Sequence, residues 1–93
     1  MGSSKELYQK TEQLLFVLMS VATGGGSDGS IYRQLRSDLI AEHRLRDTLP
    51  EFVRTCRDIG AFWSLIKSKF GHYEERRQYL RQQFEPALML LEK

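Results

Sequence analysis

The sequence predicts an all-α fold, a compact bundle of about four helices in a single domain that covers residues 1–93. Apolar side chains recur at steps of three and four, which places them on one face of a helix. Helix start and stop signals separate these stretches, and 41% apolar residues in a chain of 93 suit one small core. The start, Met-Gly-Ser-Ser at residues 1–4, is typical of a vector remnant.

The first helix is expected over residues 4–23, with Ser3 or Ser4 as its cap. Its apolar stripe has the spacing of a buried helix face and consists of Leu7, Thr11, Leu14, Leu18 and Val21. Residues 14–19 are apolar nearly all round, which favours core packing on several sides. A partner-binding groove that uses Phe16 and Met19 is the alternative interpretation.

Residues 23–30, TGGGSDGS, are predicted to form a flexible loop, because three consecutive glycines maximise backbone freedom. A second helix is expected over 30–43, capped by Asp28 or Ser30. Its buried face is predicted to contain Ile31, Tyr32, Leu35, Leu39 and Ile40.

A third helix is expected over 49–70. Thr48 and Glu51 have the spacing of a capping box, and Pro50 suits a first turn. The stripe keeps its phase across Gly60, which favours one helix over two, and it consists of Phe52, Cys56, Ile59, Trp63, Ile66 and Phe70.

A fourth helix is expected over 72–85, with an apolar face of Tyr73, Leu80 and Phe84. Pro86 is predicted to kink this helix or to restart it as a short tail helix, since proline clashes with the preceding turn.

Arg77 lies close to the centre of the apolar face expected for residues 72–85. We therefore predict a partly buried structural charge at Arg77, held by helix-end carbonyls or by a carboxylate. The candidate carboxylates are Asp47, Glu51 and Asp58.

Charge is unevenly distributed along the chain. The net charge is only +2, but residues 54–81 contain seven basic and three acidic side chains. Exposed bases of this segment are the candidate partner-binding residues: Arg54, Arg57, Lys69, Arg76 and Arg81. Their excess leaves RNA or DNA binding open as an alternative to protein binding.

The sequence gives little support to catalysis or to a cofactor. One cysteine and two distant histidines do not supply a zinc site, and no nucleophile–base arrangement is apparent. Arg36 and His43 have the spacing of an RNase superfamily motif, but such a pair is common by chance, so an RNase-like enzyme is the least favoured alternative. The charged residues, 28% of the chain, argue against a membrane span, and a single cysteine fits a reducing cytoplasm.

The chain resembles the N-terminal helical domain of AbiJ-like bacterial abortive-infection proteins. The resemblance rests on Tyr32-x-x-Leu35-Arg36, on the string from Leu49-Pro50-x-Phe52-Val53-Arg54-x-Cys56-Arg57-Asp58 through Phe62-Trp63-x-x-Ile66-Lys67-x-Lys69-Phe70-x-x-Tyr73-x-x-Arg76-Arg77, and on Phe84-x-Pro86 and Leu91-Glu92. It covers roughly residues 31–92. The resemblance implies a non-enzymatic sensing, regulatory or recruiting module of a phage-defence protein, joined to an effector domain. It leads us to expect a protein partner or self-association, with no metal, cofactor or membrane.

Overall fold

The computed structural model describes residues 4–26 and 28–92, and every regular element in these ranges is a helix. The six helices are α1 (Ser4–Ala22), α2 (Gly29–Ile40), α3 (His43–Arg46), α4 (Glu51–Thr55), α5 (Ile59–Lys69) and α6 (Tyr73–Glu92). The predicted all-α class is confirmed, with six helices in the described ranges rather than about four. The expected cap at Ser3 and most of the expected vector remnant lie outside these ranges.

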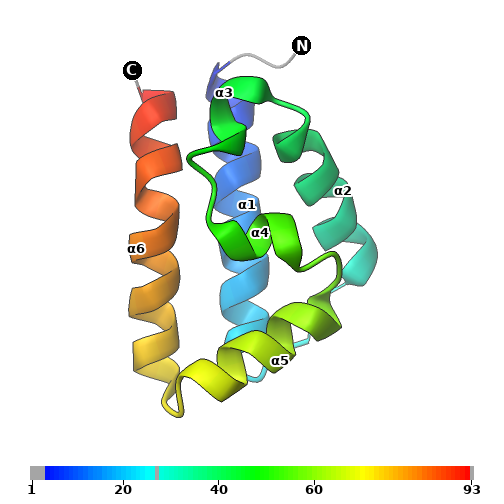
Figure 1. Cartoon of the computed structure of the whole chain (residues 1–93), viewed down its shortest axis with the longest axis vertical. Coiled ribbons are helices and arrows are strands. Elements are labelled where there is room, and N and C mark those ends of the chain that lie inside the picture. The colour runs from blue at the N-terminus through cyan, green and yellow to red at the C-terminus, as the bar shows by residue number, and fades with distance from the viewer. Residues whose placement is uncertain (1–3, 27, 93) are drawn as a thin grey trace.

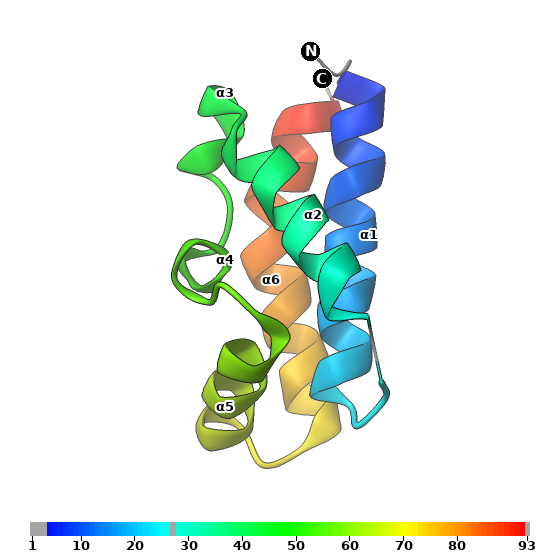
Figure 2. The same cartoon turned by 90° about the vertical axis from the view of Figure 1, so that its right-hand side faces the viewer.

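The two long helices α1 and α6 run antiparallel and make the most extensive contact in the bundle (Figure 1). Helix α2 packs against α1, and α5 crosses below the end of α1. Helices α3, α4 and α5 follow one another along one side of the bundle, with α1 on the opposite side (Figure 2). Among the described residues, the α1–α6 pair therefore has one covered side and one side that no other helix covers.

The core lies between these two layers. Its largest fully buried side chains come from all six helices, and Val53 is the one from α4. The stripe predicted for α1 is confirmed, because Leu7, Thr11, Leu14, Leu18 and Val21 are all buried. In α2 the prediction holds for Tyr32, Leu35 and Leu39, whereas Ile31 is 51% exposed.

The helix expected over 30–43 ends at Ile40, and residues 43–46 form the separate short helix α3. The capping box expected after it is absent. The Thr48 hydroxyl instead donates to the Leu45 carbonyl at 2.9 Å, and the N-cap of α4 is Pro50. Thr48 thus satisfies an end carbonyl of α3 rather than an amide of α4.

The single helix expected over 49–70 is wrong, since the chain leaves the helical conformation between α4 and α5. Asp58 caps α5 by accepting the Ala61 amide at 2.8 Å. The carbonyls at the end of α4 bind side chains of α2: Arg36 donates to Val53 and Arg54, at 2.7 Å each, and the Tyr32 hydroxyl donates to Cys56. These donors replace the amides that a continuous helix would offer.

Helix α6 runs unbroken through Pro86 to Glu92, so the short tail helix expected after residue 85 is not separate. The reason lies in its buried stripe, which keeps helical spacing beyond the proline and consists of Leu80, Phe84, Ala87 and Leu91. Burial of Ala87 and Leu91 outweighs the loss of one backbone hydrogen bond at Pro86.

The buried arginine of the fold is Arg76, whereas the sequence prediction was Arg77. Arg76 is 6% exposed and donates to the Phe70 carbonyl at 2.9 Å and to the Ala22 carbonyl at 2.8 Å. Its guanidinium lies 5.4 Å from the ring centroids of both Trp63 and Tyr73. It therefore joins the ends of α1 and α5 to the first turn of α6.

Arg77 has a side chain that is 42% exposed and pairs with Glu74 at 3.3 Å, not with any of the three carboxylates expected. Arg76 and Arg77 flank the buried stripe of α6 on opposite sides, so periodicity does not distinguish them. Arg76 is the buried one because the two helix-end carbonyls lie on its side.

Replacing Arg76 by Leu is expected to lower the free energy of unfolding by about 3 kcal/mol, because one buried and one partly buried helix-end carbonyl lose their charged donor. Arg77→Leu is the matched control, and its exposed ion pair predicts a loss of less than about 1 kcal/mol. Urea unfolding followed by circular dichroism measures both. Equal losses would show that Arg76 has no special part in holding the helix ends.

Stability at alkaline pH is expected to depend on Tyr32. Burial, together with smaller effects of neighbouring charges, raises the pKa of its phenol to about 12. The fold therefore holds the protonated form, and this stabilisation is complete below the unfolded pKa of about 10 and is lost as pH rises towards 12. In urea titrations the wild type should lose about 2 to 3 kcal/mol more over this range than Tyr32→Phe. Parallel curves for the two proteins would refute this dependence.

Candidate functional site

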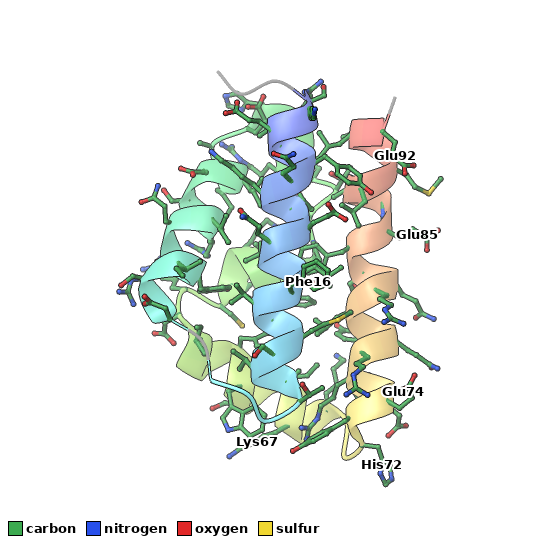
Figure 3. All side chains as sticks on the ribbon, turned by 180° about the vertical axis from the view of Figure 1, so that it is seen from behind. Phe16, Lys67, His72, Glu74, Glu85 and Glu92 are labelled. Carbon is green, nitrogen blue, oxygen red and sulfur yellow. The ribbon has the colours of Figure 1, made fainter. Side chains whose placement is uncertain are left out.

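A groove runs along the uncovered side of the α1–α6 pair. It has a volume of about 250 Å³ and is lined by Tyr8, Leu15, Arg81, Glu85, Leu88, Met89 and Glu92. Four of the five α6 residues follow one another at steps of three or four, and Met89 is adjacent to Leu88. All five therefore lie on one face of the helix. Figure 3 shows this side of the molecule, with α1 and α6 both facing the viewer. We call it the α1–α6 groove.

Two large apolar side chains stand exposed on this side of the bundle, of which Met89 lines the α1–α6 groove and Phe16 does not. Phe16 is 65% exposed and projects from α1 on the side of α6 (Figure 3), and Met89 in α6 is 53% exposed. Leu15 and Leu88 form the apolar floor of the groove. Apolar side chains gathered in a concave surface are characteristic of protein-binding sites.

The acidic side chains of the α1–α6 groove are Glu85 and Glu92, both in the C-terminal half of α6. Partial desolvation, and then the carboxylates of Glu12 and Glu92, raise the pKa of Tyr8 above its ordinary value. Glu85 and Glu92 both project from the outer side of α6 (Figure 3). Arg81 is the basic residue of the lining, and no ion pair joins it to another residue in the described ranges.

The five bases predicted to bind a partner do not gather on one surface. Arg76 is buried, so the expectation that it is exposed is wrong. Arg54 donates to the Arg46 carbonyl and lies 3.9 Å from Asp47, on the α4 side of the bundle. Arg81 lines the α1–α6 groove on the opposite side. Arg57 and Lys69 are exposed, and the Lys69 ammonium lies 5.5 Å from the Tyr79 ring centroid.

Arg36 and His43 do not form the pair expected of an RNase-like site. The Arg36 guanidinium is bound to the end carbonyls of α4. Helix α2 ends at Ile40, and His43 is exposed at the start of α3. Holding the end of α4 is therefore the role that the geometry gives to Arg36.

The cysteine is also part of the fold. Cys56 is 6% exposed, and burial raises the pKa of its thiol, which disfavours the reactive thiolate. Within residues 4–26 and 28–92, no group of three or more potential ligands could hold a metal ion. No helix in those ranges is long and apolar enough to cross a bilayer.

A second hollow of about 360 Å³ lies where the glycine loop meets α5, and Val21, Ile59 and Trp63 form its apolar wall. The loop is anchored there, because Gly25 donates to the Ser20 carbonyl at 2.7 Å and Gly24 has a φ of 87°. This hollow has no unpaired charge in its lining, unlike the α1–α6 groove.

Comparisons of the chain with protein-family models, with curated proteins and with solved structures find no significant match.

Sequence reasoning found part of the α1–α6 groove. The alternative of a partner-binding surface named Phe16 and Met19; Phe16 is exposed on the same side of the bundle and Met19 is half-buried, and neither lines the groove. Arg81 was among the candidate bases. The rest of the α6 side was missed because the helix was expected to end at 85. The spacing of Arg81, Glu85, Leu88 and Glu92 was the available signal.

Phe16→Gln is expected to leave the free energy of unfolding within about 0.5 kcal/mol of the wild type, because the ring lies in solvent and Gln is a good helix former. The matched substitution Phe62→Ala removes a fully buried ring and should cost about 3 to 5 kcal/mol. Thermal and urea unfolding measure both. A large loss for Phe16→Gln would mean that Phe16 serves the core instead of a partner.

Proposed function

We propose that this chain is a non-enzymatic protein-interaction module, the regulatory or sensing part of a bacterial abortive-infection protein that also has an effector domain. The observation that carries the interaction role is the α1–α6 groove, which has an apolar floor and the exposed Met89 in its lining, together with the exposed Phe16 on the same side of the bundle. Leaving both side chains in water is unfavourable, and a bound protein surface removes that cost.

The non-enzymatic part of the proposal is supported by the structural roles of the side chains that could otherwise take part in a reaction. Arg36 and Tyr32 bind backbone carbonyls of the α4 end, and the Cys56 thiol is buried. The antiphage context is supported by the resemblance of the string from Leu49 to Arg77 to AbiJ-like proteins. An RNA-binding role has no such support, because the exposed bases are divided between opposite sides of the bundle.

Photo-cross-linking tests the interaction role. Replacing Phe16 by p-benzoylphenylalanine puts a reactive ketone on the same side of the bundle as the α1–α6 groove, at a position that is already exposed. Illumination of bacterial cells that produce the protein should give a covalent adduct with a polypeptide, identified by mass spectrometry. The adduct should disappear when Met89→Glu is added, because a charge in the groove opposes apolar docking.

The matched control places the same photo-reactive residue at Ile31. This side chain is 51% exposed on α2, which lies on the far side of α1 from α6 (Figure 3). It should give no adduct. An absence of adducts at position 16, or the same adducts from both positions, would contradict the proposed interaction role.

A further inference from the structure

We infer that the α1–α6 groove binds a basic amphipathic helix of a partner protein, with two lysine or arginine side chains two turns apart and apolar side chains between them. This inference rests on the proposed interaction role and states the chemistry of the partner. The order of charged and apolar side chains along the α6 side of the groove carries it.

Two carboxylates bracket the apolar part of the groove. Glu85 and Glu92 are seven residues apart in α6, so they lie on one face about 10 Å apart along the axis. Leu88 and Met89 lie between them in the same lining. Neither carboxylate has an ion-pair partner within residues 4–26 and 28–92. Bases at the same spacing on a docked helix supply these partners, while its apolar side chains meet Leu88 and Met89.

Negative charge dominates the Tyr8 end of the groove. Burial raises the pKa of Tyr8, and the carboxylates of Glu12 and Glu92 raise it further. Glu12 does not line the groove, yet its charge acts on a residue that does. Arg81, the basic residue of the lining, precedes Glu85 by one turn and lies about 16 Å from Glu92 along the axis. Its charge therefore offsets part of that of Glu85 but little of that of Glu92.

The backbone of the groove favours a helix as the bound form. The amides and carbonyls of α1 and α6 bind one another within each helix, so the groove offers a docked chain side chains rather than backbone partners. An extended segment over the apolar floor of Leu15 and Leu88 leaves its own backbone groups unsatisfied, whereas a helix satisfies them internally. A surface formed by two helices also accommodates the side-chain ridges of a third.

Other occupants fit the charges of the groove less well. The phosphates of a nucleic acid or of an anionic membrane meet Glu85 and Glu92 with like charge, and so does an acidic helix. An uncharged apolar helix removes water from both carboxylates without giving them a partner, which is unfavourable.

Fluorescence anisotropy with two designed peptides tests the charge preference. The basic probe is an amphipathic helix of about 18 residues, with two lysines seven positions apart and leucines between them on one face. In the acidic probe, glutamates replace the two lysines. The wild-type chain should bind the basic probe at least about tenfold more tightly than the acidic one. A proline in the middle of the basic probe should abolish binding, because only a helix presents both lysines on one face.

Exchange of the two groove carboxylates should reverse this preference. Glu85→Lys combined with Glu92→Lys opposes the lysines of the basic probe and pairs with the glutamates of the acidic one. Asp47→Lys combined with Glu51→Lys is the matched control, because it changes the net charge equally on the α3–α4 side of the bundle. Circular dichroism confirms that each variant is folded. Equal affinity of the wild type for both probes, or a control that changes the preference as much, would overturn the inference.

Met89→Glu separates docking in the groove from a general attraction between opposite charges. The substitution adds a negative charge, yet it should weaken binding of the basic probe, because the docked helix places leucine at this position. Tighter binding of the basic probe by this variant, or undiminished binding of the proline-containing probe, would contradict a helix seated in the groove.

The photo-reactive residue at position 16 separates this inference from the proposed function. Adducts with a different polypeptide, together with the expected probe preferences, support both. Adducts from a chain that does not prefer the basic probe overturn the basic helix and leave the interaction role standing, and so do adducts between two copies of the chain. A chain with neither adducts nor a probe preference contradicts both.

Discussion

The arrangement of the helices depends on the hydrogen bonds that the Arg76 guanidinium donates to two backbone carbonyls. From the first turn of α6 this guanidinium binds the last carbonyl of α1 and the carbonyl of Phe70 just after α5, between the rings of Trp63 and Tyr73. Arg36 and Tyr32 do the same for the end of α4. Short helices have many unsatisfied end carbonyls for their length, so a domain built from them needs such donors.

The sequence was sufficient to predict the helical class and the elements whose signals are local. The stripe of α1 and the Asp28 cap of α2 depend only on residues within a few positions of one another. The same kind of reasoning found Phe16 as a candidate contact residue. It could not decide between core and surface for this side chain, because that depends on which side of α1 is packed against α6.

Distant contacts explain what the sequence did not reveal. The stripe of residues 52–70 keeps helical phase, yet the chain breaks at 56–58 because Tyr32 and Arg36, far away in sequence, bind the carbonyls of that break. Arg76 and Arg77 are equivalent on a helical projection until the carbonyl of Ala22 distinguishes them. The groove required the continuous α6, and Pro86 concealed its length.

The pairing of α1 with α6 has a consequence for how the chain acquires its structure. The largest contact of the fold joins α1 to α6, so the apolar stripe of α1 lacks its main partner until α6 has left the ribosome. Folding then requires closure of almost the whole chain, an unusually non-local step for a helical domain. The nascent α1 surface is therefore expected to be open to chaperones until α6 has emerged.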